Sequence, residues 1–361
     1  MKISGHLSLK ADVSVLTVKF SDIVGQQTAK KFLSQVMASA KIPHAYLFTG
    51  IPGVGKTSTA MAFAMSLNCK DKSSESDGCG RCTSCRQLLG GNHPDFITIR
   101  PEDQTIKIEQ IKELNRSLGF APMSGGYRVC VIHQADTMSE EAANSFLKTL
   151  EEPPPGNILI LKVMEPLDLL PTIVSRCQKV PFRPLAIADI AQWLVNNKGI
   201  EKDTALLLAG ISEGSLGRAI KMWEGDFLEK RRAWINRMET LPDLSKADAL
   251  NMALECAEED RKKGIDIPSS GEAGMVDMLS VWTNWFRDLL VLRVGGPTDL
   301  LVNTDFSESL QNIAESYNIK ALIESVLLMN QVRADIRRMR NPILVMEHAI
   351  MGLRGLVTLS S

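Results

Sequence analysis

The amino-acid sequence predicts a parallel α/β sheet with helices on both faces, followed by an all-helical C-terminal half. The first observation is a glycine-rich spacing, Gly50, four residues, then Gly55-Lys56-Thr57, which stands between an apolar run and a helical pattern. The second is the alternation of strand-like and helix-like segments as far as residue 182. The third is the loss of strand signals from Pro184 onward, where only helical patterns follow.

The glycine-rich segment has the context that a phosphate-binding loop requires. Residues 45–49 are an apolar run typical of a buried parallel strand, and the residues from Ser58 onward are apolar at helical spacing. Glycines let the loop curl until backbone N–H groups point at a phosphate, and the helix N-terminus adds partial positive charge. The glycines expected to do this are Gly50, Gly53 and Gly55.

Two side chains at the start of the following helix complete this nucleotide site. Lys56 would reach the β- and γ-phosphates, and Thr57 would offer its hydroxyl to Mg²⁺. The alternative is a chance glycine turn before a helix. Because strand, loop and helix are all in place, the sequence favours a site for ATP or ADP.

Composition limits the class of protein. The chain has 361 residues, 44% hydrophobic and 23% charged, with a net charge of −1. That balance is ordinary for a globular protein and gives no overall field that would draw the chain onto nucleic acid. The first residues show no signal-like pattern, and no apolar run approaches the length of a membrane span. We therefore expect a soluble, cytoplasmic protein.

Four of the seven cysteines cluster after the helix that follows the glycine-rich loop. They are Cys69, Cys79, Cys82 and Cys85. Two overlapping Cys-x-x-Cys steps form a tight knuckle, and four thiolates suit a tetrahedral zinc ion with no open coordination position. The alternative is a set of reduced or redox-active cysteines on a loop. We predict a structural zinc knuckle at residues 69–85.

The remaining elements follow in order. Strands are predicted at 96–99, 129–132, 158–163 and 179–182, and helices at 108–118 and 139–150, the second stopped by three prolines. Short helices are predicted at 187–197, 205–208 and 215–222, and a longer helical region from about 228 to the end. This pattern divides the chain into a nucleotide-binding domain (1–182), a small helical part (183–227) and a longer C-terminal helical part (228–361).

Several specific stretches occur together in one order. They are Asp22-Ile23-Val24-Gly25-Gln26, the glycine-rich loop, the cysteine knuckle, Ala135-Asp136, the segment 142–154 that ends Leu-Glu-Glu-Pro-Pro, and Ser175-Arg176-Cys177. With these stretches the sequence resembles the clamp-loader branch of the AAA+ ATPases, strongly over about residues 18–220 and faintly over the C-terminal helices. The resemblance implies an AAA+ domain with the zinc knuckle (1–182), a helical lid (183–227) and a helical collar domain that mediates oligomerisation (228–361). It also implies other clamp-loader subunits, the sliding clamp and primed DNA as partners.

The sequence departs from an active member of that family at one strand end. An active site carries two acidic residues there, for Mg²⁺ and for the attacking water, whereas this chain has His133-Gln134. Asp136 lies three residues on and cannot substitute without a movement of the loop. An active member also carries a polar sensor residue at the end of the next strand. In this chain that strand end is residues 162–166, and we expect the sensor positions there to be apolar. Phosphoryl transfer depends on these groups, so we predict weak nucleotide binding or binding without turnover. A catalytic role for His133 and a fully active motor ATPase are the alternatives.

Two arginines are candidates for phosphate contacts. The resemblance implies that Arg176 is an arginine finger presented to the ATP of a neighbouring subunit. An arginine in a surface salt bridge is the alternative. Arg218 falls near the second-sensor position of the lid, displaced by one residue from the usual pattern, and its contact with a phosphate is left open. An unrelated P-loop kinase is disfavoured, because no small-substrate signature accompanies the loop.

Overall fold

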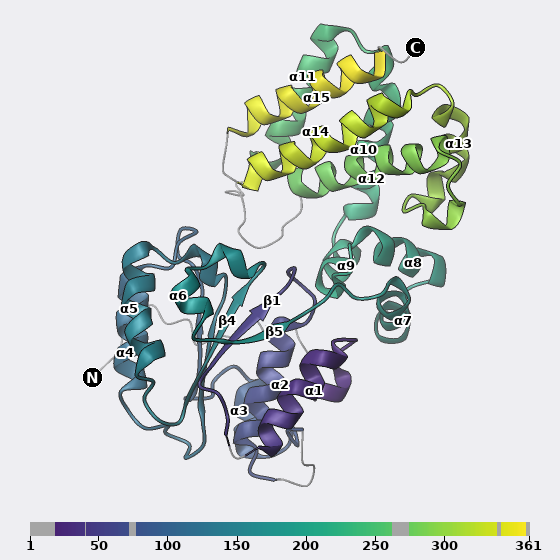
Figure 1. Ribbon diagram of the computed structural model, residues 1–361. Helices are drawn as coiled ribbons and strands as arrows, with labels where there is room; N and C mark the ends of the chain where they lie inside the picture. The colour runs from purple at the N-terminus through teal and green to yellow at the C-terminus, as the bar shows by residue number, and fades with distance from the viewer. Residues whose placement is uncertain (1–18, 40, 72–76, 262–273, 338–340, 359–361) are drawn as a thin grey trace. The chain divides into compact units, whose positions relative to one another are not determined.

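The structure is a computed structural model that describes residues 19–39, 41–71, 77–261, 274–337 and 341–358. The described residues form two compact units (Figure 1). One contains residues up to 193 together with 214–217, and the other contains 194–213 together with the residues from 218 onward. The division of the chain into three domains at 182 and 227 stays a prediction.

The first unit is built on a five-stranded sheet in the order β2-β3-β4-β1-β5. The strands are β1 (Ala45–Thr49), β2 (Phe96–Ile99), β3 (Arg128–Ile132), β4 (Asn157–Val163) and β5 (Gln178–Pro181). Every pair of neighbours is parallel. The predicted parallel α/β class is therefore confirmed, and the boundaries of the predicted strands hold to within one residue.

Helices cover both faces of this sheet (Figure 1). One face carries α1 (Gln27–Ala38), α2 (Lys56–Asn68) and α3 (Thr83–Leu89), and the other carries α4 (Ile108–Leu118), α5 (Glu140–Glu151) and α6 (Pro171–Val174). Side chains of a strand point alternately to the two faces. In β1, Tyr46 and Phe48 thus enter the core under α1–α3, and Ala45 and Leu47 enter the core under α4–α6.

The chain after β5 is helical, as predicted. The helices are α7 (Ile187–Lys198), α8 (Lys202–Ile211), α9 (Leu216–Glu224), α10 (Phe227–Thr240), α11 (Lys246–Arg261), α12 (Met275–Arg293), α13 (Ser307–Ala314), α14 (Ile319–Arg337) and α15 (Pro342–Thr358). In the second unit α12 packs against α10, α13 and α14, and α15 packs against α11 and α14. Trp282 and Trp285 of α12 are fully buried, and the Trp282 indole donates to the carbonyl of Trp234 at 2.9 Å. Within the described ranges, no helix has the length and apolar character to cross a membrane.

Candidate functional site

The loop between β1 and α2 depends on its glycines for its conformation. Gly50, Gly53 and Gly55 have φ values of +130°, +79° and +105°, in the region that favours glycine. A Cβ at position 50 would lie 2.3 Å from the carbonyl oxygen of Phe182, so no larger residue fits there without a shift of the backbone. The three glycines therefore shape a tight loop that leads directly into the N-terminus of α2, as the motif predicts.

Lys56 is the first residue of α2 and its side chain folds back over the loop. Its ammonium group donates to the carbonyls of Gly50 and Ile51, the latter at 3.0 Å. Burial lowers the pKa of Lys56 to about 8, and the nearby charge of Asp136 opposes part of that shift. The group is thus still largely charged at neutral pH and lies within the loop.

The end of β3 carries an imidazole in place of carboxylates. His133 is buried, and its Nδ1 atom lies 3.0 Å from the Nζ atom of Lys162. Burial, followed by the charges of Lys162 and Arg100, lowers the pKa of His133 to about 2. The imidazole is therefore neutral, and Nδ1 accepts a hydrogen bond from the ammonium group. Asp136 lies beyond it in a short 3₁₀ turn, and burial raises the pKa of its carboxyl group.

The expectation that the end of β4 presents apolar groups to the loop is wrong. Lys162 is the penultimate residue of β4, and its ammonium group donates both to the Thr57 hydroxyl and to His133. Strand order explains the contact, because β4 lies between β1, which leads into the loop, and β3, which leads into His133. Burial, and then the charges of Lys56 and Arg100, lower the pKa of Lys162 to about 7. The site thus contains two lysines rather than one.

The four clustered cysteines come together as predicted. Their sulfur atoms all lie within 4.8 Å of one another. A tetrahedral zinc ion with Zn–S bonds of about 2.3 Å would require S–S separations of about 3.8 Å, close to this arrangement. The four cysteines are Cys69 at the end of α2, Cys79, Cys82 at the N-cap of α3, and Cys85 within it. The cluster could hold a metal ion.

Backbone N–H groups favour thiolates in this cluster. The N–H of Cys79 donates to Cys69 Sγ at 3.3 Å, the N–H of Cys82 to Cys79 Sγ at 3.3 Å, and the N–H of Cys85 to Cys82 Sγ at 3.5 Å. The hydrogen bonds from the Arg81 and Cys82 N–H groups lower the pKa of the Cys79 thiol, whereas burial raises the pKa of the Cys69 and Cys85 thiols. A thiolate is the form that binds a metal ion, so the local backbone fits that role.

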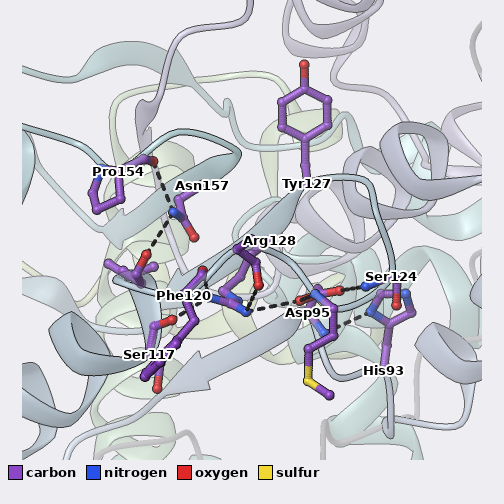
Figure 2. A network of polar contacts seen from close by, with 12 residues as sticks. His93, Asp95, Ser117, Phe120, Ser124, Tyr127, Arg128, Pro154 and Asn157 are labelled. Carbon is purple, nitrogen blue, oxygen red and sulfur yellow. Dashed lines mark hydrogen bonds and ion pairs between the residues drawn. The ribbon is translucent and has the colours of Figure 1, made fainter.

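A polar network joins the cysteine-bearing helix α3 to the sheet, and Figure 2 shows the part of it around His93, Asp95 and Arg128. Ser84 of α3 lies 3.0 Å from Nε2 of His93, and the Asp95 N–H donates to His93 Nδ1 at 3.1 Å. Nδ1 is therefore the acceptor, and Nε2 carries the proton that bonds Ser84. The Asp95 carboxylate accepts from the N–H groups of Met123 and Ser124 at 2.8 and 2.7 Å.

Arg128, the first residue of β3, closes this network. Its guanidinium group lies 3.3 Å from the Asp95 carboxylate, and both residues are almost fully buried. It also donates to the carbonyls of Ser117, Phe120 and Ala121, which end α4 and follow it (Figure 2). The two terminal nitrogens of the guanidinium group are thus bonded, whereas its buried Nε has no partner, and the bonded pair links the start of β3 to the end of α4.

Arg176 lies between α6 and β5, and its guanidinium group contacts an acidic residue of its own chain. It pairs with Glu151, at the end of α5, at 2.7 Å, and donates to the Thr172 carbonyl at 3.0 Å. The Arg176 side chain is 37% exposed and that of Glu151 is 51% exposed. The pair is thus a surface ion pair, of a kind that contributes at most about 1 kcal/mol to stability.

Arg176 and the glycine-rich loop lie at opposite ends of two neighbouring parallel strands, Arg176 before the start of β5 and the loop after the end of β1. The register of β1 and β5 pairs Tyr46 with Gln178 and Thr49 with Pro181. Arg176 precedes β5, whereas Gly50 follows β1, so the two residues are separated along the strand direction by about six residues, or ~20 Å. That separation is longer than an arginine side chain, so Arg176 cannot reach a phosphate in its own loop.

Arg218 is held by two carboxylates of the second unit. Its guanidinium group lies 2.8 Å from Asp277 and 3.4 Å from Glu213. A contact between Arg218 and a phosphate stays a prediction.

The preceding segment, residues 214–217, packs against the glycine-rich loop within the first unit. The Ser215 hydroxyl donates to the Pro52 carbonyl at 2.8 Å, and the Gly217 N–H donates to the Gly53 carbonyl at 3.0 Å. A Cβ at position 217 would lie 2.9 Å from the Gly53 Cα, so the approach is close. The loop is thus supported by a segment far away in the sequence.

Sequence reasoning missed Lys162 as a site residue. One signal was available, because a lysine within an otherwise apolar buried strand, Ile158 to Val163, needs a specific partner. The partners themselves, Thr57 and His133, depend on the strand order and could not be read from the sequence.

The fold and the loop define a class, the P-loop α/β proteins, and comparisons with known proteins narrow it. A family model described as "DNA polymerase III, delta subunit" matches residues 25–186. The chain is 28% identical to the DNA polymerase III subunit tau of Bacillus subtilis over 355 residues, which cover 92% of this chain but only 61% of tau. It is 27% identical to the delta' subunit of the same organism over 329 residues, which cover 91% of this chain and 96% of delta'.

A shorter match supports the same assignment. The delta' subunit of Escherichia coli is 32% identical over 190 residues, which cover 52% of this chain and 57% of that subunit. A solved structure of a gamma subunit-related protein of Thermotoga maritima superposes with a TM-score of only 0.38, at 19% identity, and covers 84% of this chain and 99% of its own. The assignment therefore rests on the sequence matches. These sequence matches support a member of the DNA polymerase III clamp-loader family.

Proposed function

We propose that this chain is a delta'-type subunit of the clamp loader. It would bind nucleotide at its glycine-rich loop with little or no turnover, supply Arg176 to the ATP of an adjacent subunit, and help to load the sliding clamp onto primed DNA. The observation that carries the proposal is the hydrogen bond between His133 and Lys162, at the strand end where an active ATPase needs carboxylates. Tau and delta' match at nearly equal identity, so the matches alone do not decide between them.

The groups around Thr57 do not fit Mg²⁺. This ion is bound through hard oxygen ligands, usually carboxylates together with the phosphates. Here the Thr57 hydroxyl accepts a hydrogen bond from an ammonium group, and the strand end offers a neutral imidazole. The chain's own residues can therefore hold a polyphosphate, through the loop and Lys56, without the groups that activate a water molecule for attack.

The position of Arg176 supports action on a neighbouring subunit. Arg176 cannot reach its own loop, because Arg176 precedes the start of β5 and the loop follows the end of the neighbouring parallel strand β1. Its present partner, Glu151, is a surface carboxylate, so exchange of that partner for a phosphate costs little. An arginine suits this role because it stays charged and donates a planar fork of N–H groups. The tau and delta' subunits among the relatives supply the kind of partner expected.

The first prediction concerns nucleotide. The purified chain should bind ATP and ADP and turn ATP over at a negligible rate, because His133 and Gln134 occupy the positions of the acidic pair. Lys56→Ala should weaken binding at least about tenfold, because it removes a charged donor from the phosphate site. Calorimetric titration measures the affinity, and phosphate release measures the turnover.

Lys148→Ala is the matched control for this substitution, because it removes an exposed lysine of α5. It should leave nucleotide affinity unchanged. Robust Mg²⁺-dependent turnover by the wild-type chain, lost in Lys56→Ala, would contradict the delta'-type reading and favour the alternative, a motor ATPase of the tau/gamma type.

We also propose that the four-cysteine cluster holds a structural zinc ion. Four sulfur ligands leave no open position for a substrate, and residues 72–76 between the first two cysteines are polar and cannot build a core of their own. The ion would join the end of α2 to the start of α3. The network from Ser84 through His93 to Asp95 would then carry that order into the sheet.

The second prediction tests the metal. Elemental analysis of the purified chain should return about one zinc ion per chain. Cys82→Ser should lower the zinc content and make the segment 69–89 sensitive to protease while leaving the sheet folded. Cys130→Ala is the control, because this cysteine lies in β3 outside the cluster and its loss should leave zinc in place. Metal-free protein, with an unchanged cleavage pattern for Cys82→Ser, would exclude a zinc knuckle.

A further inference from the structure

Lys162 brings a positive charge to the point where a P-loop enzyme binds its metal ion. In such enzymes a divalent cation is held between the Ser or Thr of the loop and an acidic residue at a neighbouring strand end. In this chain one ammonium group spans both positions, because it donates to the Thr57 hydroxyl and to Nδ1 of His133. The lysine thus contacts both groups that would otherwise flank the metal.

The surroundings favour this ammonium group over a metal ion. His133 is buried and neutral, so it accepts a hydrogen bond from Lys162 but contributes no negative charge for a divalent ion. A divalent cation bound at the Thr57 oxygen would lie directly beside the Lys162 ammonium, and like charges at that separation repel strongly. The neutral imidazole is also a poor ligand for Mg²⁺.

The hydrogen-bonding capacity of Lys162 leaves room for a ligand. An ammonium group has three N–H donors, and Thr57 and His133 account for two of them. The third remains for a phosphate oxygen. The Lys56 ammonium donates to the loop carbonyls of Gly50 and Ile51, and Lys162 donates to Thr57, the residue after Lys56, so both cations border the loop. The charge of Asp136 offsets part of that of Lys56, and a polyanion bound between the two lysines would offset the rest.

We propose that the Lys162 ammonium replaces the divalent cation, so that this site binds a nucleoside di- or triphosphate directly between Lys56 and Lys162 without Mg²⁺. The inference rests on the proposed function, since it assumes that the glycine-rich loop binds nucleotide. It adds the form of the ligand, which is the metal-free nucleotide. It also gives a reason for the predicted lack of turnover, because a lysine fixed at this point leaves no place for a metal-activated water.

The test is a titration of the full chain with ADP, in EDTA and in excess Mg²⁺, below the pKa of Lys162 at about 7. The wild type should bind ADP in EDTA at least as tightly as in Mg²⁺. Lys162→Met should weaken binding in EDTA at least about tenfold, because it removes a charged donor. Lys179→Met is the matched control, since it removes an exposed lysine from β5 and should change nothing.

The outcomes separate this inference from the proposed function. Tight binding only with Mg²⁺, or Lys162→Met binding ADP in EDTA like the wild type, overturns the inference and leaves a nucleotide site in place. No ADP binding under either condition overturns the nucleotide site itself. The comparison of EDTA with Mg²⁺ uses the wild-type chain, so it decides the question even where Lys162→Met fails to fold; Lys162→Gln then repeats the test with a polar side chain of similar length.

Discussion

Replacing Arg176 with alanine should lower the DNA-stimulated ATP turnover of the reconstituted clamp loader by at least about tenfold, a small part of what an arginine finger supplies in trans. The reason is positional. Arg176 lies at the end of the strands opposite to its own loop, so a phosphate that it contacts must belong to another subunit. Arg176→Lys should restore little of the rate, because an ammonium group lacks the planar fork. The variant chain should still fold and assemble.

Glu151→Ala is the control that isolates this role. It removes the in-chain partner of Arg176, 2.7 Å away, and leaves the arginine in place. If Arg176 served only that surface pair, both substitutions would have the same small effect. We expect normal turnover with Glu151→Ala and strongly reduced turnover with Arg176→Ala. Full turnover by an assembled complex that contains Arg176→Ala would contradict the prediction and show that Arg176 is only a surface cation.

Arg128→Met should destabilise the sheet-bearing unit by about 3–5 kcal/mol, the range found when one member of a buried ion pair is removed. The substitution leaves the buried Asp95 carboxylate without its cation and leaves the carbonyls after α4 without their donor. Loss of order should extend to the cysteine-bearing helix, because Asp95 holds His93 and His93 holds Ser84.

Urea unfolding followed by circular dichroism is the suitable measurement. All five tryptophans lie at position 193 or beyond, so their fluorescence reports little on the sheet. Lys107→Ala is the control, since Lys107 pairs with Asp103 on the surface and its loss should change the free energy of unfolding by less than about 1 kcal/mol. An unchanged urea midpoint for Arg128→Met would show that the buried pair is not a source of stability.

The sheet could be predicted almost residue by residue, and the reason is physical. The strands β1 to β4 are short, largely buried and mainly apolar runs bounded by glycine, proline or polar residues, whereas β5 is mostly exposed. The loop was equally clear, because the positive φ values at its three glycines are the reason for their spacing. The clustering of the four cysteines followed from their spacing in the sequence.

Contacts across the sheet could not be predicted in the same way. The meeting of Lys162 with Thr57 and His133 depends on β4 lying between β1 and β3, and strand order is a property of the whole domain. The ion-pair partner of Arg176 could not be predicted either, since Glu151 lies 25 residues away at the end of another helix. The support of the loop by Ser215 and Gly217 joins segments more than 160 residues apart.

The opposite placement of Arg176 and the glycine-rich loop also has a consequence for symmetry. A two-fold interface pairs one surface patch with a copy of itself, whereas a head-to-tail interface joins two different patches. If Arg176 and the loop belong to different patches, an assembly that uses this arginine is head-to-tail, with each subunit facing the same way around the circuit. In such a directional arrangement, a subunit whose own site does not turn over still completes the site of the subunit beside it.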